Sequence, residues 1–206
     1  MIDTKADRIA PYVNRMDKIL LLGQSVERSF DSNEEFKRSL NGLKICRLAT
    51  VPYFMVFQLK IQAEYLRDLG MQVVLVSSSG LEWSQIRAGG GLSAEIIPIP
   101  RSLSPWKDFI ALVRLIRFFM MQRFDIVHST TPKAGLLTAI AAFLARVPVR
   151  LHTFTGQPWV ALKGPMRWGS RSADRLIGIL DTRCYADSGS QAKFLVDEGI
   201  ISADKL

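Results

Sequence analysis

From residue 43 onward, the sequence alternates between short apolar runs and longer segments with apolar residues at helical spacing. Six runs rich in Val, Ile and Leu predict strands buried on both faces, at 43–51, 72–78, 94–100, 125–128, 147–154 and 182–188. The helical segments are 56–70, 81–88, 105–124, 133–145, 165–180 and 191–199. Strands separated by helices predict a mainly parallel sheet with right-handed crossovers. We therefore expect an α/β, Rossmann-like, doubly wound domain over residues 43–206, with helices on both faces.

Residues 1–42 differ from the rest, because one apolar cluster, "DKILLLGQ", is followed by the polar stretch "SFDSNEEFKRSLNG". We expect this segment to be an amino-terminal extension, partly flexible or formed of short helices. The tripeptide Gly89–Gly91 follows a predicted helix and precedes a strand, so we interpret it as a linker.

The composition, 48% hydrophobic and 22% charged, is typical of a globular protein with a core. The sequence contains no run of 18 apolar residues without a charge, so it predicts no membrane-spanning helix. The amino terminus lacks the pattern of a signal peptide. Cys46 and Cys184 fall in predicted strands, which favours inert core thiols and a cytoplasmic location. The net charge of +8 lies outside residues 1–42, which hold seven basic and seven acidic residues. Such a charge favours phosphates, anionic lipid or nucleic acid as partners.

The stretch "FDIVHSTTPKAG" (124–135) predicts a strand, a polar turn and a new helix. Thr131 is a candidate N-cap with Pro132 at the first helical position. Lys133 and Gly135 then place a cation and a small residue at a helix N-terminus, which suits an anion. His128 stands at the carboxyl end of the strand, where open α/β sheets bind ligands. The alternative is a plain connecting loop.

The fifth strand runs into "HTFTGQPW" (152–159), where hydroxyl, amide and aromatic groups gather. Thr153, Thr155 and Gln157 offer hydroxyl and amide groups to sugar hydroxyls, Gly156 relaxes the backbone, and Trp159 offers a flat face. The alternatives are a loop with a buried Trp159 and a core histidine at His152. Together with the previous stretch, this loop predicts a cleft built from residues 51–55, 128–135, 154–159 and 187–191.

Two predicted helices carry basic residues on one side. Lys107, Arg114 and Arg117 share an arc of the helix at 105–124, and Lys163, Arg167, Arg171 and Arg175 recur at every fourth position of a later segment. Either set is compatible with a solvated helix face or with attraction to anionic lipid. The basic helices carry no aromatic platform for stacked bases, so nucleic acid is the least favoured partner.

Several familiar sites are missing from the sequence. No G-x-G-x-x-G follows the first strand, which disfavours a nicotinamide dehydrogenase. Two histidines and two scattered cysteines predict no metal site, and neither a Walker loop nor a G-x-S-x-G elbow occurs.

Five blocks of the sequence resemble family 4 glycosyltransferases in their order: "KICRLATVPYF", "RSLSPWKDFIALVRLIRFF", "FDIVHSTTPKAGLL", "VPVRLHTFTGQ" and "SQAKFLVDEGI". The resemblance covers about residues 43–206 and is to the amino-terminal, acceptor-side domain of that GT-B fold, in enzymes of capsule, O-antigen and exopolysaccharide assembly. It implies transfer of a hexose from a nucleotide-sugar to a lipid-linked glycan acceptor at the inner membrane face, with retention and without a metal or other cofactor.

We expect the substrate-binding residues to be Pro52, Tyr53, His128, Thr131, Lys133, Gly135, Thr155, Gly156 and Gln157. Among them, the resemblance supports His128, Lys133 and the loop at 155–157 as cleft residues. His128 and Thr155 are the candidates for a catalytic role, although the family's loop histidine is replaced by Thr155 and its glycine pair by Pro52-Tyr53-Phe54. For membrane or phosphate contact we expect Lys107, Arg114, Arg117, Arg167 and Arg171.

The family's donor domain usually carries an E-x7-E pair after the segment that this chain resembles. Glu27 and Glu35 have this spacing but precede the first strand, so we interpret them as coincidence. We therefore expect half of an enzyme, a fragment or a split partner, that is inactive alone. The alternative is a non-catalytic module that binds a polyprenyl-phosphate sugar or a partner protein.

Overall fold

The computed structural model describes residues 9, 13, 34–88 and 91–206. Its strands coincide with the six predicted runs: β1 (Lys44–Leu48), β2 (Gln72–Ser77), β3 (Ser93–Ile96), β4 (Ile126–Thr130), β5 (Val149–Phe154) and β6 (Arg183–Ala186). The third strand ends earlier than predicted, because Pro98 and Pro100 have no N–H to donate to a neighbouring strand. β4 continues two residues further than predicted, to Thr130.

The six strands form one sheet in the order β3-β2-β1-β4-β5-β6, and every neighbouring pair is parallel. Arg47 of β1 pairs with His128 of β4, and Thr130 of β4 pairs with Thr153 of β5. The strand order reverses between β1 and β4. Because ligands bind outside the carboxyl ends of strands at such a reversal, this edge is where a site is expected. The predicted Rossmann-like fold is confirmed.

The helices after residue 42 follow the predicted segments. In chain order the helical elements are α2 (Glu34–Leu40), α3 (Pro52–Phe54), the π-turn η2 (Met55–Leu59), α4 (Lys60–Asp68), α5 (Trp83–Ala88), α6 (Pro105–Gln122), α7 (Pro132–Leu144), the 3-10 turn η3 (Pro158–Val160), α8 (Gly164–Leu180), α9 (Gly189–Asp197) and the 3-10 turn η4 (Ala203–Lys205). The helical region predicted at 56–70 begins earlier than predicted, because Pro52 starts the short helix α3.

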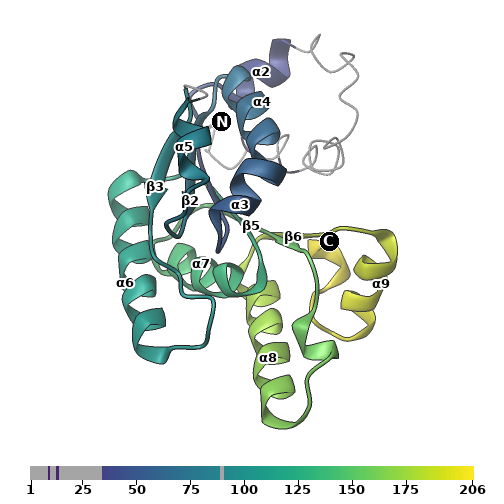
Figure 1. Ribbon diagram of the computed structural model, residues 1–206. Coiled ribbons are helices and arrows are strands. Elements are labelled where there is room, and N and C mark those ends of the chain that lie inside the picture. Colours follow the sequence, from purple (N-terminus) through teal and green to yellow (C-terminus); the bar gives the residue numbers. More distant parts are fainter. Residues whose placement is uncertain (1–8, 10–12, 14–33, 89–90) are drawn as a thin grey trace.

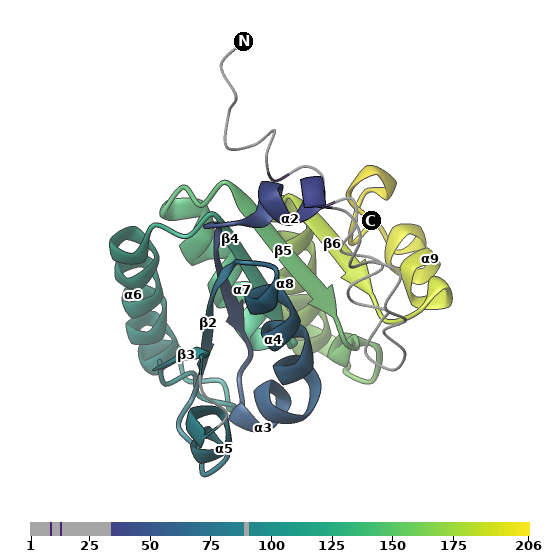
Figure 2. The same cartoon turned by 90° about the horizontal axis from the view of Figure 1, so that it is seen from above.

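Helices cover both faces of the sheet, with α4 and α5 on one face and α6, α7 and α8 on the other (Figures 1 and 2). The first core cluster contains Ile45 and Leu66 and lies under α4. A second contains Phe119 and Val127 under α6 and α7, and a third contains Ile177 beside α8. Cys46 and Cys184 are buried free thiols, and burial raises the pKa of each, as expected for inert core cysteines.

Part of the predicted extension belongs to the main core. Leu40 of α2 and Ile9 are fully buried in the first cluster, and Val13 packs against it. The Tyr185 hydroxyl donates to the Val13 carbonyl over 3.3 Å. The rest of residues 1–33, including Glu27, and Gly89 and Gly90 of the predicted linker lie outside the described residues. A domain boundary at residue 42 stays a prediction.

Candidate functional site

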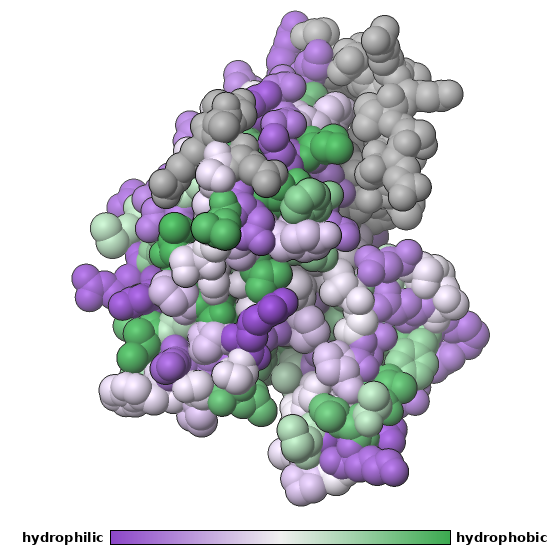
Figure 3. All heavy atoms as spheres, viewed as in Figure 1, coloured by the Kyte–Doolittle hydropathy of each residue, from purple (hydrophilic) through white to green (hydrophobic). Residues whose placement is uncertain are grey.

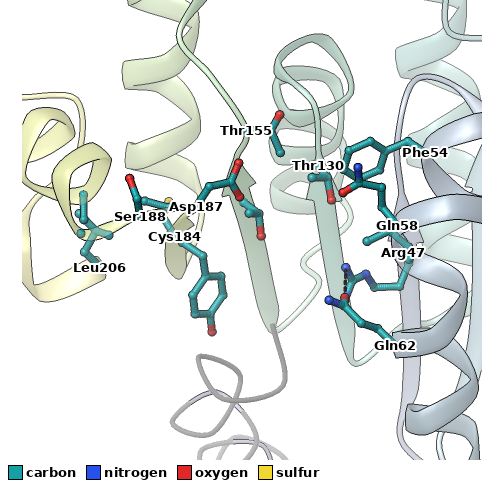
Figure 4. Close-up of a pocket in the computed structure, with 16 residues that line it drawn as sticks. Arg47, Phe54, Gln58, Gln62, Thr130, Thr155, Cys184, Asp187, Ser188 and Leu206 are labelled. Atoms are coloured by element: carbon teal, nitrogen blue, oxygen red, sulfur yellow. Dashed lines mark hydrogen bonds between the residues drawn. The ribbon is translucent and has the colours of Figure 1, made fainter. Parts of the chain in front are cut away.

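A cavity of about 640 Å³ lies at the carboxyl edge of the sheet. Figure 4 shows Arg47 and Gln62 on one side of it, Asp187 and Ser188 on the other, and Thr130 and Thr155 between them. Each of the four predicted cleft loops supplies lining residues, namely Phe54, Thr130, Thr155 and the segment 187–189. The lining is rich in hydroxyl and amide groups, which suits a ligand with many hydroxyls.

His128 acts on this cavity through Thr153. The imidazole is fully buried, and its Nε2 lies 2.8 Å from the Oγ1 of Thr153, which lines the cavity. Burial, with help from the nearby Arg47 charge, holds the pKa of His128 well below its usual range, so the ring is neutral. His128 is not itself a lining residue, so it does not reach a ligand directly.

The neutral ring determines which way the hydrogen bond runs. The Nδ1 of His128 is buried and has no hydrogen-bond partner. An orphaned N–H is rarer in proteins than an orphaned acceptor, so we infer that Nδ1 carries the lone pair and Nε2 carries the proton. Nε2–H then donates to Thr153, whose own hydroxyl proton is left to point at the cavity. The hydroxyl of Thr130, which pairs with Thr153 in the sheet, is also buried without a hydrogen-bond partner.

Sequence reasoning missed the cavity wall formed by Arg47, Gln58 and Gln62. Arg47 is 1% exposed, and its Nη2 donates to the Gln62 Oε1 over 3.2 Å. Gln58 lies on the π-turn η2, an irregularity that is frequent at functional sites. A charged residue within the apolar run "KICRL" was the available signal for Arg47.

Thr131 occupies the predicted N-cap position, with Pro132 as the first helical residue, but its side chain does not cap the helix. Its Oγ1 instead accepts from the Thr50 backbone N–H over 3.2 Å and lies 2.8 Å from the Thr50 hydroxyl. Its backbone φ is +81°, a conformation that β-branched residues rarely adopt. Backbone strain of this kind gathers at functional sites, here where the strand order reverses.

Lys133 is not free to hold an anion, contrary to the sequence-based expectation. Its Nζ lies 2.7 Å from the Asp108 carboxylate on α6 and also donates to the Ser102 carbonyl. The two charged side chains are only 17% and 19% exposed. Lys133 therefore joins the first turns of α6 and α7, and its charge is neutralised.

Gly135 is small for a packing reason. A Cβ at this position would lie 2.4 Å from the His152 Cε1, so no larger residue fits without movement. The His152 Nδ1 lies 2.8 Å from the Ser129 hydroxyl, and burial lowers the pKa of His152 to about 3. His152 is thus the satisfied core histidine that the sequence allowed as an alternative.

The loop after β5 lines a second cavity of about 420 Å³, which brings Pro132 together with Thr155, Gly156 and Gln157. Gly156 has a φ of +153°, which favours glycine, and the Gln157 Nε2 is buried without a partner. The polar loop therefore stands beside the α7 N-terminus, as the sequence predicted.

The predicted aromatic face of Trp159 is wrong as a sugar platform. The indole is 1% exposed and stacks on Phe194 at 5.6 Å, while the Arg171 guanidinium lies 5.5 Å from the ring centre. Its Nε1 donates to Asp174 over 2.8 Å. Trp159 is core, as the alternative interpretation held.

Pro52 and Tyr53 stand beside the main cavity without lining it. Pro52 is buried against the loop at Gly80, where an added Cβ would lie 2.4 Å from the proline ring. Tyr53 is 56% exposed and lies 4.5 Å from the Phe57 ring.

The basic residues divide into two groups. Lys107, Arg114, Arg117 and Arg167 are exposed. Arg171 pairs with Glu198 over 2.8 Å, and Arg175 donates to the Gly199 carbonyl, so these two hold the end of α9. Arg171 thus makes contacts within the chain, and its expected contact with a membrane stays a prediction. Within the described part of the chain, no group of three His, Cys, Asp or Glu residues could hold a metal ion.

Residues 59–190 match the family model described as a glycosyl transferase 4-like domain. The match covers more than half of the chain, which therefore belongs to this family. The resemblance to family 4 enzymes is confirmed, and the fold and family together define a glycosyltransferase-like domain.

Two curated relatives are glycosyltransferases according to their names, and one of the names specifies capsular polysaccharide biosynthesis. The capsular polysaccharide biosynthesis glycosyltransferase CapM of Staphylococcus aureus is 36% identical over 121 residues, which are 59% of this chain and 31% of CapM. The UDP-Gal:alpha-D-GlcNAc-diphosphoundecaprenol alpha-1,3-galactosyltransferase of Escherichia coli is 41% identical over 56 residues, 27% of this chain and 14% of the enzyme. The matched regions thus span less than a third of either relative.

Solved structures share the fold at low sequence identity. A glycosyltransferase from Rickettsia africae superposes with a TM-score of 0.58 and 18% identity, over 80% of this chain and 42% of that one. A UDP-N-acetylglucosamine 2-epimerase from Rickettsia bellii gives 0.60 and 12%, over 80% and 44%. Because epimerases share this fold, the fold alone does not indicate sugar transfer. Among the described residues, no helix combines the length and apolarity needed to span a bilayer.

Proposed function

We propose that this chain is the acceptor-side domain of a hexosyltransferase that moves a sugar from a nucleotide-sugar to a lipid-linked glycan in polysaccharide assembly. The observation that carries the proposal is the hydroxyl- and amide-lined cavity at the carboxyl edge, formed largely within the family-matched segment. The E. coli relative, whose name gives a diphosphoundecaprenol-linked acceptor, supports this substrate class.

The cavity has groups suited to hold an acceptor sugar from two sides. Thr153 donates its hydroxyl proton into the cavity, because the hydrogen bond from His128 uses only one lone pair of the hydroxyl oxygen, and Thr130 lines the cavity beside it. Asp187, across the cavity, is a carboxylate whose pKa is raised by burial, and it accepts hydrogen bonds from sugar hydroxyls when ionised. A ring held between these groups has its orientation fixed, which is how positioning lowers a barrier.

In this proposal neither His128 nor Thr155 acts as a catalytic base. His128 is a positioning residue, because it acts through Thr153 and its pKa is too low for it to accept a proton near neutral pH. Thr155 lines the cavity and contributes a hydroxyl to binding. Retention and independence of metal and cofactor remain part of the proposal, on the strength of the family.

We further propose that the 206-residue chain alone does not turn over. The matched regions span less than a third of either curated relative, and transfer requires a donor held against the acceptor in a cleft that excludes water. The donor-binding part would then be supplied by another domain or partner. Because the acceptor is lipid-linked, we also propose that the protein associates peripherally with the cytoplasmic face of the membrane. A binding module without transfer is the alternative, and no nucleic-acid partner is proposed.

The test is binding and turnover of a defined acceptor, N-acetylglucosamine diphosphate bearing a short isoprenoid chain. We expect the purified chain to bind it and to form no product with a panel of nucleotide-sugars. Thr153→Val should weaken binding about fivefold, the usual effect of one lost hydrogen bond. Thr138→Val is the control, because the Thr138 hydroxyl is buried without a hydrogen-bond partner and Thr138 does not line the cavity. Failure of the acceptor to bind, or equal effects of both variants, would contradict the proposal.

A further inference from the structure

The chain's excess charge is confined to one segment. Residues 101–181 hold twelve Lys and Arg against four Asp and no Glu, a difference of +8. The remaining residues hold fifteen basic and fifteen acidic side chains, so they are neutral overall. Residues 101–181 include the whole of α6, α7 and α8, the helices on one face of the sheet (Figures 1 and 2). The net charge of the protein is thus carried by this part of the fold.

The four carboxylates of this segment are withdrawn from the surface. Asp125, Asp174 and Asp181 are 5%, 2% and 2% exposed. Asp108 is paired with Lys133, and its side chain is 19% exposed. The surface of residues 101–181 therefore presents cations without exposed acidic side chains between them.

The same segment also exposes large apolar side chains along α6. Trp106, Phe109, Val113 and Met120 are 72%, 56%, 38% and 59% exposed, and the preceding Leu103 is 81% exposed. The spacing of the four helical residues is three to four positions, with Arg117 completing the series, which places them on one stripe of the helix. Ile110 and Met121 extend the stripe towards Arg114 and Lys107. We call these seven apolar residues the α6 ridge. Figure 3 shows green and purple spheres interleaved over this helix.

A bilayer surface with anionic headgroups is the partner that accepts both features. Apolar side chains enter the boundary between headgroups and acyl chains, while flanking Lys and Arg meet the lipid charges. A second copy of the chain would bring like-charged faces together, which is unfavourable. Nucleic acid would meet the cations but leave the ridge in water.

We propose that the α6 ridge inserts into the surface of an anionic membrane and that Lys107, Arg114 and Arg117 bind its headgroups. The inference rests on the proposed function in one respect, since a lipid-linked acceptor lies in that membrane. The start of α8 adds a second contact, because Met166 and Trp168 are 61% and 75% exposed beside the exposed Arg167. In Figure 1, α6 and α8 flank α7 on the same face of the sheet.

Tryptophan fluorescence offers a direct test with the full chain. Trp106 and Trp168 are exposed, whereas Trp83 and Trp159 are 3% and 1% exposed. In Trp168→Phe, Trp106 is the exposed tryptophan that reports on the α6 ridge. Vesicles of phosphatidylcholine and phosphatidylglycerol with brominated acyl chains should shift its emission to the blue and quench it. Binding of these vesicles without quenching would overturn insertion.

Surface variants separate the electrostatic contribution of the basic residues from the apolar contribution of the α6 ridge, and they leave the core unchanged. Arg114→Gln with Arg117→Gln should weaken vesicle binding about 30-fold at low salt, from two headgroup contacts. Phe109→Ser should remove the binding that survives high salt. Ile61→Ser is the matched control, because Ile61 is 64% exposed on α4 and outside the ridge. Binding that is indifferent to all of these changes would overturn the proposal, as would a ridge-dependent dimer in sedimentation.

These vesicles contain no lipid-linked sugar, so the result is independent of the proposed transfer function. Loss of membrane binding with intact acceptor binding would overturn this inference alone. The reverse result would overturn the proposed function alone.

Discussion

The hydroxyls of Thr50 and Thr131 lie 2.8 Å apart and join the loops that follow β1 and β4. The bond crosses the point where the strand order reverses, and the Thr50 N–H donates to the same Thr131 oxygen. In this position Thr131 has a strained backbone conformation, with a φ of +81°. We infer that the bond pair holds the strained turn that places Thr130 at the cavity.

Substitution of Thr131 should reveal the strain. Thr131→Val and Thr131→Ala lose the hydrogen bonds but keep a Cβ at positive φ, and we expect each to destabilise the protein by about 1–2 kcal/mol. Thr131→Gly loses the same bonds but relieves the strain, so it should be more stable than Thr131→Ala. Urea unfolding measures the order of the three. A glycine variant less stable than the alanine variant would show that the turn is unstrained.

The packing of His152 on Gly135 predicts a steric cost. Gly135→Ala places a Cβ against the imidazole, and we expect a loss of about 1–3 kcal/mol in the free energy of unfolding. Gly169→Ala is the control, since a Cβ there meets nothing within 4 Å and alanine favours the helix. The cost should shrink when His152 is also replaced by Ala. Equal behaviour of the two glycine variants would contradict this account.

Lys133 should matter for stability and not for binding. Lys133→Gln leaves the Asp108 carboxylate without its ion pair, so we expect a loss of about 1–3 kcal/mol, matched by Asp108→Asn. Affinity for the isoprenoid-linked N-acetylglucosamine diphosphate should stay within about twofold of the wild type. Calorimetric titration decides the matter. A large loss of affinity in Lys133→Gln would restore Lys133 as an anion ligand.

The stability of the chain should depend on pH through Asp181. Burial raises its pKa to about 8, against the lowering effect of Arg150 and Lys205. The folded state then keeps a proton that the unfolded state releases, so stability falls as pH rises towards 8. Burial also raises the pKa of Asp174 to about 6, so Asp174 acts in the same direction as Asp181 at lower pH. Below about pH 6.5 the unfolded state binds protons at His128 and His152, whose pKa values are lowered in the folded state, and this opposes the effect of the two carboxyl groups.

We therefore expect a nearly flat stability between about pH 4 and 6, and a fall of ~2 kcal/mol between about pH 6.5 and 8. Asp181→Asn should abolish the fall, whereas Asp197→Asn, which alters an exposed carboxylate, should keep it. Chemical unfolding at a series of pH values provides the measurement. A fall that persists in Asp181→Asn would assign it to another group.

The sheet and helices were predictable because their signals are local. The runs at 72–78 and 147–154 are apolar and β-branched, and the segment 105–124 begins with Pro105 at a first helical position. Their parallel arrangement followed from alternation alone. The cleft loops followed from the same logic, since each comes directly after a strand.

The side-chain contacts of the site were not predictable, because they join residues far apart in the sequence. Lys133 meets Asp108 across two helices, and Trp159 is covered by Phe194 of α9. Nothing local distinguishes these contacts from free side chains. For Arg47 the signal is local, because the sequence shows a charged residue inside an apolar strand. Its contact with the cavity depends on the face of the sheet on which the side chain lies, and the sequence does not show that face.

The most direct test of the central claim is a map of acceptor binding by amide chemical shifts. The isotopically labelled chain would be titrated with the isoprenoid-linked N-acetylglucosamine diphosphate. We expect shifts concentrated at Thr130, Thr153, Thr155 and residues 187–189, reduced in Thr153→Val and unchanged in Thr138→Val. Shifts centred away from the carboxyl edge, or none at saturating acceptor, would contradict the assignment of this cavity as the acceptor site.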